Sequence, residues 1–227
     1  MKMVMWGATD VGQARQVNED SFLLAPDHGF LAVADGMGGY QRGDVAAELA
    51  CNVLKETITA HRHVVDLFRR SPSEAARSAV QTVLDTAMQN ACKEVHEAAV
   101  AITGKGGRMG TTMDVVLLVG RTAFIAHVGD GRIYLLRGDE NHQITKDHTL
   151  AQQHKDEGRE MDEKELMNSR NIMTRALGVF SSVQVDALSF DLDVGDRLVI
   201  CSDGLYRYLD EVLICLRRQT VRFASPT

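Results

Sequence analysis

Three hydrophobic stretches of this 227-residue chain each end in the dipeptide Asp-Gly. They are FLAVADG, AFIAHVGDG and RLVICSDG, which end at Asp35-Gly36, Asp130-Gly131 and Asp203-Gly204. One such ending is typical of a turn, whereas three indicate strand ends that converge at one edge of a sheet. Carboxylates gathered there would repel one another and raise each other's pKa, and a hard divalent cation removes that penalty. Oxygen ligands suit Mg²⁺ or Mn²⁺ better than zinc.

A fourth acidic element lies upstream, in RQVNEDSF. Glu19 and Asp20 would face opposite sides of a strand, so both reach one site only if the backbone turns there, and Asn18 favours such a turn. Arg15 offers a planar pair of donors that suits two phosphate oxygens. An arginine, several carboxylates and two metal ions indicate phosphoryl transfer or hydrolysis, in which a metal-activated water attacks phosphorus.

Short apolar runs predict the strands that carry these residues. They lie at 3–8, 21–25, 30–34, 113–119, 123–128, 133–136, 185–190 and 197–201. The region 117–138 is expected to form consecutive antiparallel strands, joined by turns at Gly120-Arg121 and at 129–131.

Two segments, 44–60 and 72–102, have apolar residues at helical spacing. Ser71, Pro72 and Glu74 predict the start of the second helix, as cap, first helical position and capping-box partner. The polar segment 145–171 is expected to form short surface helices. This order predicts an α+β layered domain with antiparallel sheets rather than regular βαβ winding.

Composition narrows the class of protein. The chain is 44% hydrophobic and 25% charged, with a net charge of −6, which excludes the basic footprint of a nucleic-acid binder. Its four cysteines are far apart, which favours free thiols in a reducing compartment. No signal peptide is recognised, and no run approaches the ~18 apolar residues of a membrane span. We therefore expect one cytoplasmic domain, residues 1–227.

Seven motifs resemble, in order, those of metal-dependent serine/threonine protein phosphatases of the type 2C (PPM) class. They are RQVNEDS, VADGMGG, GTT at 110–112, AHVGDGR, TKDHTL, NIMTRALG and VICSDGL. They cover about residues 7–210, and the small bacterial members are the most similar. The resemblance implies two packed antiparallel β-sheets flanked by pairs of antiparallel helices. It also implies hydrolysis of phosphoserine and phosphothreonine on proteins by a metal-bridging water, opposing a serine/threonine kinase, and we expect a monomer.

The resemblance implies a role for each matching residue. Asp35 would bridge two Mn²⁺ or Mg²⁺ ions, Glu19 and the Gly36 carbonyl would complete one ion, and Asp203 would bind the other. Asp130 would hold a weaker third ion together with Asp203. Asp20 would orient the bridging water, and Arg15 would bind the substrate phosphate. The segment 148–171 would form a flap that influences substrate choice.

The chain departs from the family pattern in three places. Gly131 stands where many relatives have serine, and Met37 stands where some eukaryotic relatives have a histidine proposed as general acid. No Asp-Asn follows residue 204, although relatives end in a strand opened by that pair, whose aspartate binds a metal. The C-terminal strand region therefore resembles a truncation, and 211–227 is an atypical tail. The alternative function is a catalytically impaired phosphatase-like binding or regulatory module.

Four further residues have competing interpretations. Cys201 and Arg207 have the C-x5-R spacing of cysteine-dependent phosphatases, but Asp203 between them would repel phosphate, so a buried thiol is favoured. His127 is expected to be a core histidine with satisfied hydrogen bonds rather than a metal ligand. His148 is expected to be a helix cap or a surface group.

Overall fold

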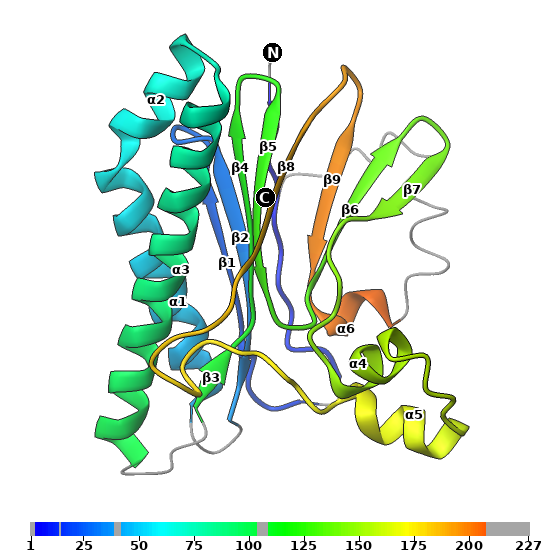
Figure 1. Ribbon diagram of the computed structural model, residues 1–227. Helices are drawn as coiled ribbons and strands as arrows, with labels where there is room; N and C mark the ends of the chain where they lie inside the picture. Colours follow the sequence, from blue (N-terminus) through cyan, green and yellow to red (C-terminus); the bar gives the residue numbers. More distant parts are fainter. Residues whose placement is uncertain (1–2, 14, 39–41, 104–108, 208–227) are drawn as a thin grey trace.

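The computed structural model describes residues 3–13, 15–38, 42–103 and 109–207. Three layers lie side by side: a layer of helices, a six-stranded sheet and a three-stranded sheet (Figure 1). No helix within the described ranges is long and apolar enough to cross a membrane. The atypical tail lies outside the described residues. Both sheets are antiparallel, as expected.

The six-stranded sheet carries most of the core. Its strand order is β1-β2-β4-β5-β8, and β3 also pairs with β2. The bounds are Asp20–Ala25 for β1, Phe30–Met37 for β2, Gly110–Thr111 for β3, Met113–Val119 for β4, Thr122–Val128 for β5 and Asp186–Asp191 for β8. On β4, Val115 and Leu117 pack in the core under the helices, whereas Val116 packs between the sheets. This alternation explains why β4 is a continuous apolar run in the sequence.

The smaller sheet has the order β7-β6-β9. Its strands are β6 (Arg132–Arg137), β7 (Glu140–Gln143) and β9 (Arg197–Cys201). Ile133 packs with Val116 and Ile125 between the two sheets. The prediction of consecutive paired strands over 117–138 is therefore wrong after Val128. The chain leaves one sheet there and enters the other, so the turn at 129–131 connects two layers.

Three helices cover the outer face of the six-stranded sheet (Figure 1). They are α1 (Gly43–Ala60), α2 (Arg62–Arg70) and α3 (Glu74–Thr103), and α1 and α3 form an antiparallel pair. Alanines at 46, 47 and 50 are fully buried, and such small side chains let α1 approach the sheet closely. Within the described residues, the helices that pack along a sheet all lie on this side, so only one of the expected flanking pairs is present.

The start of α3 differs from the prediction. Ser73, not Ser71, is the cap, because its carbonyl accepts from Arg77 and its hydroxyl accepts from the Ala76 N–H at 3.2 Å. Pro72 therefore precedes the cap. The short helix α2, which has only nine residues, was not predicted, and its Val65 and Phe68 are buried.

Two further differences concern strands. The apolar run at 3–8 forms no strand, whereas the polar run of β7 does. Short helices over 145–171 are confirmed as α4 (Leu150–Asp156), capped by Thr149, and α5 (Glu163–Arg170), capped by Asp162. A last short helix, α6 (Asp203–Tyr206), follows β9. The helices α4, α5 and α6 lie together at one end of the two sheets (Figure 1).

Candidate metal centre

Asp20 and Asp35 face each other across two neighbouring strands. They are direct partners in the β1–β2 register. Asp20 opens β1, and its Oδ2 accepts a hydrogen bond from the Ser202 hydroxyl at 2.7 Å. Ser202 directly precedes Asp203 and follows β9 of the other sheet. These contacts bring the acidic ends of both sheets to one place.

The backbone of Asp35 is fixed by Thr112 of the GTT motif. The Asp35 N–H donates to the Thr112 hydroxyl at 2.9 Å, and the Thr112 N–H donates to the Asp35 carbonyl at 2.9 Å. The next residue, Gly36, pairs with Thr111 of β3. A side chain at Gly36 would place its Cβ only 2.1 Å from the Gly43 carbonyl oxygen. Glycine is required there because β2 touches the start of α1, a reason that the sequence did not reveal.

Glu19 and Arg15 lie beside this contact. The Asn18 side chain accepts from the Asp20 N–H at 3.1 Å, so the turn expected at Asn18 is present. Glu19 Oε1 accepts from the Gly43 N–H at 3.2 Å, at the positive end of the α1 dipole. Arg15 forms an ion pair with Glu19 Oε2 at 3.4 Å, and its side chain is 74% exposed. Its guanidinium is therefore available to a ligand from solvent.

Asp130 lies in the turn that crosses between the sheets. Gly129 has φ of 121°, and an added Cβ would lie 2.5 Å from the Thr112 side chain. On the other side of Asp130, a Cβ at Gly131 would lie 1.8 Å from Asp114 Oδ2. The buried Asp114 side chain occupies the space that a serine at Gly131 would need, which explains this departure from the family pattern.

Asp203 opens helix α6. Its Oδ2 forms an ion pair with Arg207 at 2.7 Å. Asp203 belongs to the three-stranded sheet side, whereas Asp35 and Asp130 extend from the six-stranded sheet. The expected convergence is therefore confirmed, with one correction: the carboxylates meet at the common end of two packed sheets, not at one edge of a single sheet.

The electrostatics of this carboxylate cluster, formed by Asp20, Asp35, Asp130 and Asp203, favour a cation. The pKa of Asp35 is raised to about 8, chiefly because the carboxyl is buried. The charges of its three neighbours raise it further. Burial, followed by the charge of Asp203, raises the pKa of Asp130 to about 6. Neither Asp35 nor Asp130 has an ion-pair partner among the described residues.

The donor set fits a hard divalent cation. All the donors are oxygens, as Mg²⁺ and Mn²⁺ prefer. Among the described residues, however, no three acidic, histidine or cysteine side chains are already arranged as a metal-binding group. Two of the predicted ligands already have partners within the chain. Asp203 forms an ion pair with Arg207, and Glu19 binds the Gly43 N–H and Arg15. Metal binding would require these two side chains to exchange partners.

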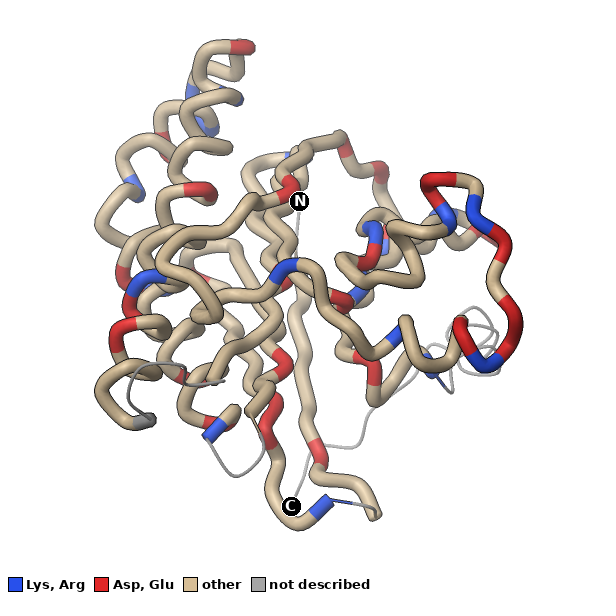
Figure 2. Tube along the Cα trace, turned by 60° about the horizontal axis from the view of Figure 1, so that its bottom comes forward, with Lys and Arg blue, Asp and Glu red and all other residues tan. Residues whose placement is uncertain are grey.

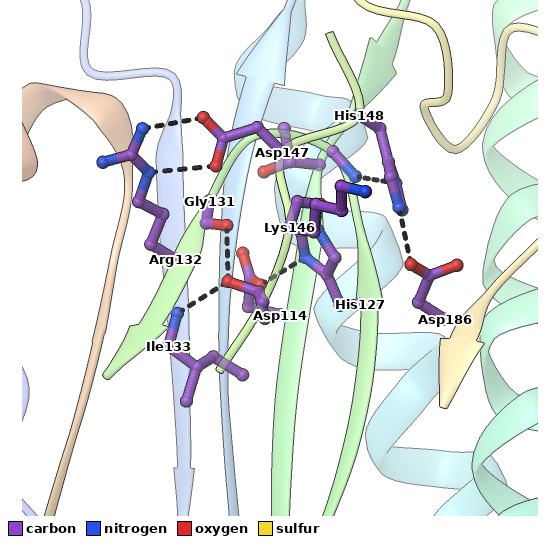
Figure 3. A network of polar contacts seen from close by, with 12 residues as sticks. Asp114, His127, Gly131, Arg132, Ile133, Lys146, Asp147, His148 and Asp186 are labelled. Carbon is purple, nitrogen blue, oxygen red and sulfur yellow. Dashed lines mark hydrogen bonds and ion pairs between the residues drawn. The ribbon is translucent and has the colours of Figure 1, made fainter. Parts of the chain in front are cut away.

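A buried pair lies behind the Asp130 turn (Figure 3). His127 Nδ1 and Asp114 Oδ1 are 2.7 Å apart, and His127 Nε2 donates to the Lys146 carbonyl at 3.0 Å. One proton therefore lies between Nδ1 and Oδ1. Burial opposes a charged His127, but Asp114 reverses that effect and raises the pKa of the ring. The interpretation of His127 as a satisfied core histidine is confirmed.

His148 differs from its prediction, because it is buried and neither caps a helix nor lies on the surface. Its Nδ1 accepts from the Gly129 N–H at 3.1 Å, so Nε2 carries the proton and donates to Asp186 at 3.1 Å (Figure 3). Burial lowers the pKa of His148 to about 4, which keeps the ring neutral. Arg175 neutralises Asp186 at 2.6 Å. His148 thus joins the Asp130 turn to the start of the flap segment.

Cys201 is not a nucleophile. Its side chain is buried, and burial raises the pKa of the thiol to about 12, so almost no thiolate exists at neutral pH. The charge of Asp114 adds to this rise. The cysteine-phosphatase interpretation of the C-x5-R spacing is therefore excluded in favour of the buried thiol.

Sequence reasoning missed four residues that shape the site, namely Thr112, Asp114, His148 and Ser202. Thr112, His148 and Ser202 lie in the recognised motifs GTT, TKDHTL and VICSDGL, but no role in the site was assigned to them. Asp114 interrupts an otherwise apolar strand, and that anomaly is the signal that could have revealed it. The partner of Ser202 could not be read from the sequence, because Asp20 is 182 residues away.

Comparisons with known proteins agree with this geometry. The family model for protein phosphatase 2C matches residues 11–225. The serine/threonine phosphatase stp of Listeria innocua is 34% identical over 208 residues, which cover 89% of this chain and 78% of that protein.

Two solved structures have the same fold. One is the catalytic domain of the serine/threonine phosphatase PstP in complex with two manganese ions. It is 32% identical with a TM-score of 0.71, and the match covers 91% of this chain and 80% of that one. The other is the serine/threonine phosphatase of S. agalactiae, 29% identical with a TM-score of 0.77, where the match covers 94% and 85%.

Proposed function

The chain belongs to the protein phosphatase 2C family and is a metal-dependent serine/threonine phosphatase, and we propose that its carboxylate cluster is the catalytic metal centre. One observation carries the proposal: the buried Asp35 carboxyl lies among three other carboxylates, and no described residue neutralises it. A divalent cation is the ligand that allows these groups to ionise together.

The proposed ligands follow the family pattern. Asp35, Glu19, the Gly36 carbonyl and Asp203 would hold two ions, and Asp130 together with Asp203 would hold a weaker third ion. Manganese is supported by the PstP structure, and magnesium has the same ligand preference.

The chain's own residues position the reactants. When bound, the cations would supply positive charge and an activated water for attack on phosphorus. Asp20 would orient the attacking water, and the Ser202 hydroxyl, which donates to Asp20 Oδ2 at 2.7 Å, fixes the carboxylate for that role. Arg15, whose side chain is 74% exposed, would turn from Glu19 to two oxygens of the substrate phosphate, and a cation bound at Glu19 would replace the charge that Arg15 withdraws.

The proposed domain and substrate class of the protein follow from the same site. We propose one catalytic domain over 1–227, with the flap at 148–171, acting as a monomer on phosphoproteins made by a serine/threonine kinase. A cytoplasmic location is supported by Cys51, Cys92 and Cys201, which are buried and free. The impaired-module alternative is not favoured, because the relatives that match most of the chain are named serine/threonine phosphatases.

The test is phosphate release from p-nitrophenyl phosphate and from a phosphothreonine peptide, with Mn²⁺ and with EDTA. We expect activity that EDTA abolishes and that Asp35→Ala removes. Asp139→Ala, a change in the exposed turn between β6 and β7, is the matched control and should retain activity. Activity that persists in EDTA, or in Asp35→Ala, would exclude the proposed centre.

A further inference from the structure

A basic cleft lies between strand β6, the helices α4 and α5 and helix α6. Its volume is about 740 Å³. Five cationic side chains line it, namely Arg132, Lys155, Arg159, Arg170 and Arg207. We call it the flap cleft, because α4 and α5 belong to the flap segment.

The flap cleft is basic because the segment 145–171 lines it mainly with basic side chains, not because the segment contains more basic residues. Seven acidic residues lie in 145–171, at positions 147, 156, 157, 160, 162, 163 and 165, against five lysines and arginines. Both signs follow one another along the trace of this segment in Figure 2. Only Asp147 among the seven lines the cleft, and Arg132 binds both of its oxygens, at 2.9 and 2.8 Å. The fold therefore collects positive charge on one side of an acidic segment.

Two of the cations are available to a ligand. Arg159 pairs with Glu165, and Arg207 pairs with Asp203. Lys155 and Arg170 are exposed and have no ion pair with any described residue. They extend from α4 and α5 respectively, so they can contact a ligand from two sides. Met161 and Leu166 add apolar surface against which the aliphatic part of a peptide side chain can pack.

The flap cleft adjoins the carboxylate cluster. Arg207 bonds Asp203, and the Arg132 guanidinium lies 3.8 Å from the centre of the Tyr206 ring. Arg132 follows Asp130 by two residues. A peptide whose phosphorylated residue reaches the cluster would therefore place its neighbouring residues over Lys155 and Arg170.

We propose that the flap cleft binds an acidic stretch of the substrate protein beside the phosphorylated residue. The ligand is a peptide with Asp or Glu, or with a second phosphate, next to the site of hydrolysis. This inference rests on the proposed function, because it assumes that the carboxylate cluster receives the phosphoester. Exposed ion pairs are individually weak and salt-dependent, so a preference of about tenfold at low salt is expected from two or three contacts.

The test compares phosphothreonine peptides that differ only in flanking residues: glutamate, lysine, or phosphoserine. The measured quantity is the ratio of kcat/KM for the glutamate peptide to that for the lysine peptide, which cancels changes in the basal rate. We expect a ratio near ten for the native chain and near one for Lys155→Glu/Arg170→Glu. A higher rate for the phosphoserine peptide than for the glutamate peptide would identify a second phosphate as the preferred ligand.

The matched control for Arg170→Glu is Lys164→Glu, which reverses one charge on the same helix α5 at a residue that does not line the flap cleft. It should keep the native ratio. A ratio near one in the native chain, an unchanged ratio in the double variant, or an equal loss in Lys164→Glu would each overturn the proposal. Lys155→Ala/Arg170→Ala repeats the test if charge reversal impairs folding.

Binding of the same peptides, followed by fluorescence anisotropy, separates the two proposals. Absence of phosphate release from every substrate would reject the proposed function alone. Equal affinity of the native chain for the glutamate and lysine peptides would reject only the proposal that the flap cleft binds acidic residues. Salt provides a further check. The ratio of kcat/KM for the glutamate and lysine peptides should decrease as the salt concentration rises from about 50 to about 500 mM, because salt screens exposed charges.

Discussion

The carboxylate cluster and a polar network both adjoin the Asp130 turn, and both contain acidic side chains, of which Asp114 is fully buried and Asp186 is 40% exposed. The network consists of Asp114, His127, His148, Asp186 and Arg175. In the network each carboxylate has a basic partner, at 2.7 Å for Asp114 with His127 and 2.6 Å for Asp186 with Arg175. In the cluster the nearest charges to Asp35 are other carboxylates.

This difference separates a structural polar group from a ligand site. A buried acid with a basic partner can fix the backbone around it. Desolvation still opposes its ionisation, because the pKa of Asp114 is raised and its Oδ2 has no hydrogen-bond partner among the described residues. The ionised form of a carboxyl surrounded by other carboxylates is unfavourable unless a cation binds among them. The network therefore holds the Asp130 turn in place, while the cluster retains unfavourable charge that the proposed metal binding would relieve.

The largest expected effect comes from Asp35→Asn. Activity with Mn²⁺ should fall by about 10³-fold or more, since the loss of a bridging ligand removes several kcal/mol of transition-state stabilisation. The metal-free variant should nevertheless melt at a higher temperature than the native chain near neutral pH, because the amide avoids the cost of burying or protonating a carboxyl that ionises in the unfolded chain. Calorimetry in EDTA measures this, with Asp139→Asn as the control. A lower melting temperature for Asp35→Asn would contradict this expectation.

The next effect is on the pH dependence of stability in EDTA. The folded pKa of Asp35 is about 8, above the value of 3.8 for a model carboxyl, so the folded state binds more protons between these values. The free energy of unfolding should therefore fall as pH rises from about 4 to 8, by about 1.4 kcal/mol per unit at most. Mn²⁺ should flatten this slope, and Asp35→Asn should remove most of it. A stability that rises over this range in EDTA would disprove the argument.

A smaller effect on stability is expected from a substitution beside the polar network. Gly131→Ser would place its Cβ against Asp114 Oδ2, which cannot turn away because Oδ1 is held by His127. Urea unfolding should show a loss of about 1–3 kcal/mol, as for other overpacked sites. In an Asp114→Ala background the same change should cost much less. Equal costs in the two backgrounds would show that the two positions are independent.

Much of this site was predictable, because strand ends and family motifs are local features. The three Asp-Gly endings identified Asp35, Asp130 and Asp203 as neighbours, and Asn18 predicted the turn that presents Glu19. His148 was misplaced because its surroundings come from Gly129 and Asp186, which are distant in sequence. The start of α3 was misplaced by two residues because Ser71 and Ser73 flank Pro72, and both match a cap pattern.

The sequence by itself determined most of the elements and the chemistry of the donors. Apolar periodicity indicates the buried strands and the two long helices, though not α2 or the polar strand β7, and oxygen-only donors favour a hard cation. Tertiary structure alone decided that Asp20 and Ser202 meet, that Asp114 excludes a side chain at Gly131, and that Lys155, Arg159 and Arg170 line one cleft. These features depend on how two sheets pack together, and contacts between residues far apart along the chain leave no periodic pattern in the sequence.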